Sequence, residues 1–295
     1  MTHKIGIHAF VWVGGWSEQE CRQALERSRA SGYELIEIPL LEPGAIDATM
    51  TRRMLEEFGL EATCSLALTP ETDISSTDGA VVARGERLLQ EALAVARDLG
   101  ARYLGGVISG ALTRYREPLA PAGRENSLQV LARLAQRAAA SDMVLGLEVV
   151  NRYESNFLNT AQQALALIGE LGAENVVVHL DTYHMNIEEE GFLQPVLACG
   201  QKLGYVHVSE SHRGYLGTGT VDFPAFFQAL KQIDYRGPIT FESFSRAQEI
   251  AGLSSSLAIW RSTWTDSLDL ARQARAFIAA GLREAGFSEN GSRER

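Results

Sequence analysis

The sequence predicts an α/β fold in which eight parallel strands, each followed by a helix, close into a (β/α)8 or TIM barrel. Short apolar runs rich in β-branched residues alternate with longer helical patterns along the chain, as in successive βαβ units. Four of the later runs end near a glutamate, aspartate or histidine, which is typical of strands whose carboxyl ends meet on one face. The 295 residues are 45% hydrophobic, and barrels of this kind commonly have about 250 residues in one domain. We therefore expect residues 1–295 to form a single catalytic domain.

The first half of the chain contains four units of strand and helix. Ser17 and Glu20 form a capping-box pattern at the start of the first helix, which should end at Gly32. Gly59 and Gly100 close the next two helices. The expected strands cover 4–11, 33–40, 60–68 and 101–109, and the expected helices cover 17–31, 45–58, 79–99 and a segment rich in alanine and leucine that runs through Ala140.

The second half continues the alternation with four strands that carry the candidate site residues. These strands are expected at 143–149, 174–181, 203–209 and 237–243, with helices near 160–171, 190–202 and 223–233. Two further helical stretches, at 247–260 and 265–285, should pack outside the barrel as extra C-terminal helices. The polar tail from residue 287 onward is expected to be disordered.

Composition excludes several classes of protein. The formal charge is −10, from 37 acidic and 27 basic residues, so a nucleic-acid partner is not expected. The three cysteines are widely spaced and lack a CxxC pair, which argues against a disulfide framework and fits a reducing cytoplasm. No apolar run approaches roughly 18 residues, and the N-terminus leads directly into a strand. We expect a soluble, cytoplasmic protein that does not bind membranes.

Four side chains of types that commonly ligate metal ions lie near the ends of the later strands: Glu148, Asp181, His207 and Glu242. A single carboxylate at the end of a strand is often only a solvated loop residue. Here all four follow apolar residues, so they should lie at the rim of a dry barrel, where an unpaired carboxylate is costly to bury. The set is rich in hard oxygen ligands and suits a divalent ion such as Mn²⁺ or Mg²⁺, while also admitting Co²⁺.

The segments around these residues resemble the D-tagatose 3-epimerase family. They are GLEVVNRYESNFLNT, HLDTYHMNIEEE, HVSESHRGYLGTGTVDF and ITFESFS. This family includes D-psicose (D-allulose) 3-epimerases and L-ribulose 3-epimerases, and it belongs to the xylose-isomerase-like TIM barrel superfamily. The similarity covers essentially the whole chain.

The resemblance implies a role for each matching residue. It implies that Glu148, Asp181, His207 and Glu242 bind the metal, usually manganese or cobalt in this family, and that Glu148 and Glu242 are also the acid/base pair. It further implies that Glu154, His184 and Arg213 contact the substrate. A homodimer or homotetramer is the assembly that the resemblance suggests.

The chemistry also follows from the residues themselves. Epimerisation beside a carbonyl requires removal of a weakly acidic proton and its return to the opposite face. A metal that chelates the carbonyl and the neighbouring hydroxyl would stabilise the enediolate. Because one base cannot easily serve both faces, Glu148 and Glu242 would act as base and acid and would exchange roles for the other epimer. Arg213, His184 and Glu154 would hold the substrate in line.

Three other residues have two plausible interpretations. Cys64 lies inside an apolar strand, where a small buried hydrophobe is the commoner role, although the family places a substrate-facing residue there. His8 shares a strand face with Gly6 and Phe10 and would either point into the pocket or be a satisfied core histidine. His179 shares the parity of Asp181, which suggests a position beneath the metal, where it would either be purely structural or support the metal ligands.

The substrate is expected to be a free ketose of the D-tagatose, D-psicose, D-fructose or L-ribulose type, because no basic cluster marks a phosphate site. Ala111 and Leu112 stand where many family members carry a tryptophan, so the choice between ketohexose and ketopentose stays open. Three other functions are alternatives. A related isomerase or inosose-type dehydratase could use the same metal site. A barrel endonuclease would need a basic face that binds DNA. A sugar-binding module would bind the sugar without converting it.

Overall fold

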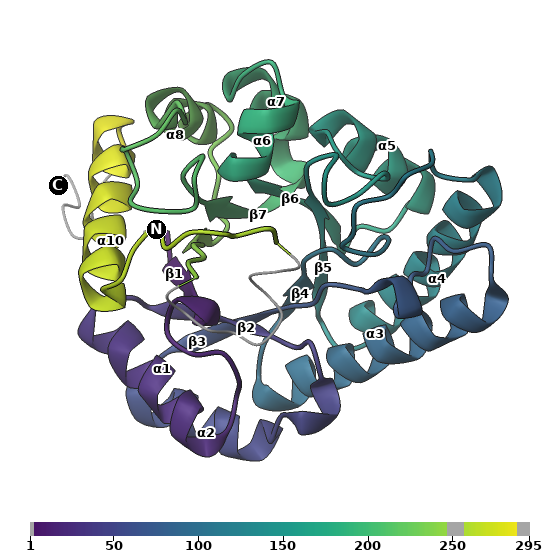
Figure 1. Ribbon diagram of the computed structural model, residues 1–295, viewed down its shortest axis with the longest axis horizontal. Coiled ribbons are helices and arrows are strands. Elements are labelled where there is room, and N and C mark those ends of the chain that lie inside the picture. Colours follow the sequence, from purple (N-terminus) through teal and green to yellow (C-terminus); the bar gives the residue numbers. More distant parts are fainter. Residues whose placement is uncertain (1–2, 247–256, 288–295) are drawn as a thin grey trace, which may run out of the picture.

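The computed structural model describes residues 3–246 and 257–287, and its eight parallel strands close into a barrel in which β1 pairs with both β2 and β8. The strands lie at the centre of the molecule with helices around them (Figure 1). They are β1 (Ile5–His8), β2 (Leu35–Pro39), β3 (Glu61–Ser65), β4 (Tyr103–Gly105), β5 (Val144–Val149), β6 (Val176–Asp181), β7 (Leu203–Val208) and β8 (Ile239–Phe241). The predicted fold class is confirmed.

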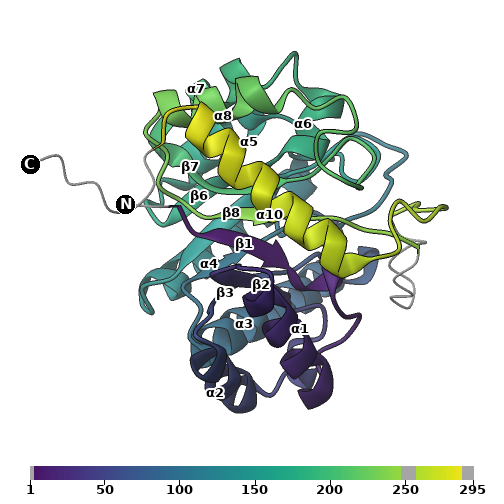
Figure 2. The ribbon, with the colours of Figure 1, turned by 90° about the vertical axis from the view of Figure 1, so that its left-hand side faces the viewer.

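The helices form the outer layer of the barrel. They are α1 (Glu18–Ala30), α2 (Ala48–Phe58), α3 (Gly79–Leu99), α4 (Pro121–Ala139), α5 (Ala161–Leu171), α6 (Thr182–Glu188), α7 (Leu193–Cys199), α8 (Phe223–Gln232) and α10 (Ser267–Glu284). The predicted capping box joins Ser17 and Glu20, and Gly59 and Gly100 end their helices with positive φ. The predicted helix at 265–285 is α10, which lies outside β1 and β8 (Figure 2). Among the described residues, no helix has both the length and the apolar character needed to cross a membrane.

The structure differs from the sequence prediction at several element ends. The first strand stops at His8, because its Nδ1 accepts a hydrogen bond from the N–H of Phe10 and the chain turns into a short 3-10 helix, Ala9–Val11. Helix α6 follows β6 directly and was not predicted; Asp181 caps it by accepting from the N–H of Tyr183. Of the helix expected at 247–260, residues 247–256 lie outside the described residues, and 257–260 form a turn and irregular chain. The expected disordered tail also falls largely outside them, at 288–295.

The interior of the barrel is more polar than the Val-, Ile- and Leu-rich filling usual for this fold. Tyr103 and Tyr205 stack inside it with ring centroids 4.3 Å apart, and the ring of His179 lies 4.8 Å from that of Tyr205. Gly146 on β5 makes room for this stack, because a Cβ there would lie 1.8 Å from Tyr103 Oη. The aromatic and polar layer forms the floor beneath the carboxyl ends of the strands.

Candidate metal centre and active site

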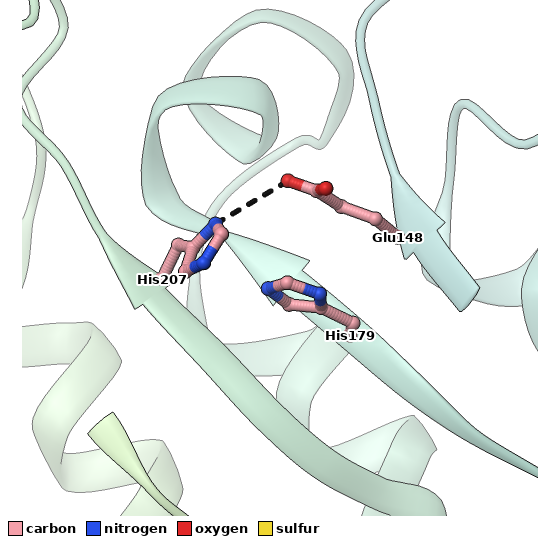
Figure 3. Close-up of side chains that lie close together, drawn as sticks. All are labelled: Glu148, His179 and His207. Carbon is pink, nitrogen blue, oxygen red and sulfur yellow. Dashed lines mark ion pairs between the residues drawn. The ribbon is translucent and has the colours of Figure 1, made fainter. Parts of the chain in front are cut away.

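The four predicted metal ligands converge at the carboxyl ends of four adjacent strands. Glu148 lies on β5, Asp181 ends β6, His207 lies on β7, and Glu242 follows β8; all four are buried. His207 Nδ1 is 3.4 Å from Glu148 Oε1 and 3.6 Å from Glu242 Oε1. Ligand atoms of Asp181, His207 and Glu242 all lie within 4.8 Å of one another. Figure 3 shows the side chains of Glu148, His179 and His207 close together, with the Glu148–His207 ion pair dashed.

The chemistry of this group fits a divalent cation. Among the described residues, buried His207 Nδ1 has no hydrogen-bond partner, and it faces the two glutamates, the position at which an ion would satisfy all three groups. Burial raises the pKa of Glu148 and of Asp181, so their negative charges need a nearby cation. Burial lowers the pKa of His207, but Glu37 and Glu242 outweigh this and raise it well above its usual value. The metal-free ring thus attracts a proton that ion binding would release.

Arg213 connects the ligand cluster to the substrate cavity. Its Nη1 donates to Asp181 Oδ2 at 2.8 Å, to Ser209 Oγ at 2.9 Å and to Glu242 Oε2. The guanidinium lies over the ring of Tyr183, 3.9 Å from its centroid. Burial lowers the pKa of Arg213, but Asp181 and Glu242 outweigh it and raise the pKa, so the side chain stays a cation.

The loop that presents Arg213 is organised by a buried glutamate, Glu210. Its carboxylate accepts hydrogen bonds from the backbone N–H groups of Ser211 at 2.8 Å and Gly217 at 2.9 Å, and its carbonyl accepts from the N–H of Arg213 at 2.8 Å. Arg213 itself has φ 60°, an uncommon conformation for a residue with a side chain. The loop therefore holds Arg213 in a strained backbone conformation that directs its guanidinium over the site.

Glu154 and His184 lie at the same cavity and share one hydrogen-bond partner, Asn151. The Asn151 backbone N–H donates to His184 Nδ1 at 3.1 Å, and its side-chain amide donates to Glu154 Oε1 at 2.9 Å. Burial and Arg213 lower the pKa of His184 well below its usual value, so the ring is neutral, and its Nε2 lies 3.4 Å from Arg213 Nη2. Burial also raises the pKa of Glu154. Both side chains thus present polar atoms to the cavity.

Comparison with known proteins places this site in a family. The model of the xylose isomerase-like TIM barrel family matches residues 25–273. The chain belongs to this family. It is 52% identical to an L-ribulose 3-epimerase of Methylomonas sp. (strain DH-1), over 92% of this chain and 96% of the relative. It is 48% identical to a ketose 3-epimerase of Arthrobacter globiformis, over 93% and 95% of the two chains.

Solved structures agree with these relatives. The crystal structure of a D-allulose 3-epimerase from Methylomonas sp. in complex with D-allulose has a TM-score of 0.93 and 51% identity, and the match covers 94% of this chain and 96% of the other. The resemblance to ketose 3-epimerases drawn from the four motifs is confirmed.

The expected substrate contacts His8 and Cys64 have different positions in the structure. His8 is buried and lines the cavity, with its Nε2 3.7 Å from Glu37 Oε1, and burial lowers its pKa to about 4. Cys64 is fully buried in the hydrophobic core, and the cavity is lined instead by its neighbour Ser65. Side chains alternate along a strand, so Cys64 faces away from the barrel interior. The expected substrate contact at Cys64 is therefore corrected by the structure.

Sequence reasoning missed Glu37, which lies on β2 across the barrel from His207. Glu37 is completely buried, and its Oε2 is 2.8 Å from His207 Nε2. Burial raises the pKa of Glu37, but His207 outweighs this effect and lowers it, so the carboxylate is ionised. A charged residue inside the apolar run LIEIP was a signal that could have identified it.

Proposed function

We propose that the protein is a divalent-metal-dependent 3-epimerase of free ketoses. The observation that carries the proposal is the approach of Glu148 Oε1 and Glu242 Oε1, from strands β5 and β8, to the same nitrogen of His207. Two carboxylates beside one cation site are what a two-base inversion at a carbon next to a carbonyl requires. The relatives named as L-ribulose, ketose and D-allulose 3-epimerases support the same reaction class.

The metal would be held by Glu148, Asp181, His207 and Glu242. Manganese is the proposed ion, with cobalt or magnesium as alternatives, and when bound it would supply a Lewis acid that spreads the charge of the enediolate. These ligands include both proposed acid/base residues. Proton transfer and charge stabilisation would thus take place at one point of the cavity.

The proposed mechanism uses the two glutamates alternately. For one epimer, Glu148 removes the proton from the third carbon, and Glu242, carrying a proton, returns one to the opposite face; for the other epimer the roles reverse. Arg213, which stays a cation, donates to the oxygens at the carbonyl end of the sugar, and His184 beside it contacts the same oxygens. Glu154 accepts from a hydroxyl. These contacts keep the reacting carbon aligned between the glutamates.

The cavity wall supports a free sugar as the substrate rather than a sugar phosphate. Among the described residues that line the cavity, Arg213 is the only lysine or arginine, and its Nη1 is already bonded to Asp181 and Glu242. Apolar side chains, including Phe10, Leu66 and Phe244, form part of the cavity wall. A phosphate dianion would find no unpaired cation among the described residues of this wall.

The test is incubation of the manganese-loaded protein with D-fructose, D-tagatose, D-psicose and L-ribulose, followed by chromatographic separation of the products. We expect at least one of these sugars to give a mixture with its C3 epimer. Two results would reject the proposal. One is a new ultraviolet-absorbing enone, the product of a dehydratase; the other is sugar binding without turnover of any of the four.

A further inference from the structure

We propose that Glu37 is a positioning residue of the metal centre, one that fixes the ring of His207 so that Nδ1 is presented to the ion. This inference rests on the metal site of the proposed function. It adds a residue of strand β2 to a centre whose four ligands come from strands β5 to β8.

The first observation is the direction of the hydrogen bond. His207 Nε2 lies 2.8 Å from Glu37 Oε2, and a carboxylate can only accept. The ring proton at this end must therefore be on Nε2. When an ion is bound, Nδ1 supplies the lone pair, and Nδ1 is the atom that faces Glu148 and Glu242 without a hydrogen-bond partner.

The second observation is that the Glu37 oxygen next to His207 is also bonded to a tyrosine that is itself held in place. Tyr205 donates its hydroxyl to the same oxygen, Glu37 Oε2, at 2.8 Å. Tyr205 Oη also lies 2.8 Å from Thr63 Oγ1 and 2.6 Å from Thr240 Oγ1. This network crosses the barrel from β2 and β3 to β7 and β8. The carboxylate consequently has little freedom to follow any movement of the imidazole.

The third observation is the cost of placing a carboxylate here. Glu37 is 0% exposed, and a buried ionised carboxylate is expensive unless it is paired and hydrogen-bonded. Ile36 and Ile38, which flank it in the strand, are apolar and face the opposite side of β2. The charge is explained if it orients His207 and makes its Nδ1 a better ligand, and loss of such partners typically weakens metal binding about 10–100-fold.

The test compares metal affinity in the wild type, Glu37→Gln and Tyr205→Phe by calorimetric titration of the metal-free proteins with Mn²⁺. Glutamine keeps the shape of Glu37 but removes its charge, and we expect Mn²⁺ binding about 10–100-fold weaker. Tyr205→Phe removes one hydrogen bond to the same carboxylate and leaves the Glu37–His207 contact, so its loss of Mn²⁺ affinity should be much smaller. Equal affinity in Glu37→Gln and wild type overturns the inference, and so does an equal loss in both variants.

The same titration separates this inference from the proposed function. If the wild type binds no Mn²⁺, the proposed metal site itself fails; if only the difference between variants is absent, the role of Glu37 fails. Should Glu37→Gln not fold, ¹⁵N NMR of the Mg²⁺-loaded wild type provides the decision. We expect the His207 proton on Nε2, in slow exchange with solvent. A proton on Nδ1 overturns the inference.

Discussion

Arg213 neutralises two of the carboxylates that a metal ion would bind, so its replacement should destabilise the metal-free protein much more than the metal-loaded protein. Its Nη1 bonds to Asp181 and Glu242, and all three side chains are buried. In Arg213→Ala the two carboxylates lose this cation. In the absence of metal they remain buried without compensation.

The size of the stability loss in metal-free Arg213→Ala follows from the burial of Arg213 and its two partners. Removing one partner of a buried ion pair costs about 3–5 kcal/mol, because the remaining charge is left uncompensated. At roughly 2 °C per kcal/mol for a chain of this size, the melting temperature of metal-free Arg213→Ala should fall by about 6–10 °C. A divalent ion supplies positive charge to the same carboxylates, so the Mn²⁺-loaded variant should recover most of the loss. The increase in melting temperature caused by Mn²⁺ is therefore larger in the variant than in the wild type.

The assay is thermal unfolding with and without Mn²⁺ after chelation. Arg124→Ala is a matched control, because Arg124 pairs with Glu170 on the surface, with side chains 37% and 47% exposed. Arg124→Ala should lower the free energy of unfolding by at most about 1 kcal/mol, and by the same amount with and without metal. Arg213→Ala should also show a higher KM or a lower kcat while retaining its metal. An equal fall in melting temperature with and without Mn²⁺, or loss of metal from the variant, would refute the reasoning.

Four further predictions follow from the site and the barrel. Chelation should abolish epimerisation and Mn²⁺ or Co²⁺ should restore it; full activity in rigorously metal-free protein contradicts this. In heavy water, metal-loaded Glu148→Gln and Glu242→Gln should not epimerise but should each exchange the proton of an opposite epimer, and exchange of the same epimer by both, measured by NMR, indicates a single base. Gly146→Ala should lower the free energy of unfolding by about 1–3 kcal/mol, because the added Cβ would clash with Tyr103. Gly169→Ala in α5, where the added Cβ meets open space, should raise it by about 0.5–1 kcal/mol. Equal effects of the two substitutions in a denaturant titration would contradict this prediction. Light scattering at micromolar concentration should give the mass of a dimer or tetramer, and a monomer would count against the family expectation.

The parts of the fold that could be predicted from the sequence are those with a local signal. Gly59 and Gly100 mark helix ends because each takes a positive φ, and the eight apolar runs mark the strands. The ligands at strand ends were identifiable for the same reason: an acidic residue such as Glu148 lies near the end of an apolar run, and closure of the barrel brings the ends of these runs together. Helix α6 has seven residues and begins immediately after β6, so no periodic pattern revealed it.

The parts that could not be predicted depend on contacts between distant strands. Cys64 and Ser65 face opposite sides of β3, so only one of them can line the cavity. The register of β3 with β2 and β4 decides which one does. Glu37 and His207 meet across the barrel, 170 positions apart in the chain. The sequence shows a charge inside an apolar strand, but not the partner that makes the charge tolerable.

The charge balance of the site connects these distant contacts to the chemistry. Within the described structure, the site contains one guanidinium, that of Arg213, and five carboxylates, which are Glu37, Glu148, Glu154, Asp181 and Glu242. A protonated His207 would offset only one more negative charge. An excess of buried negative charge is costly, and a divalent ion removes most of it at the position where the ligand atoms already converge. The same ion that would activate the sugar would therefore also stabilise the fold around it, so metal affinity, stability and turnover should change together when one of the proposed metal ligands is replaced.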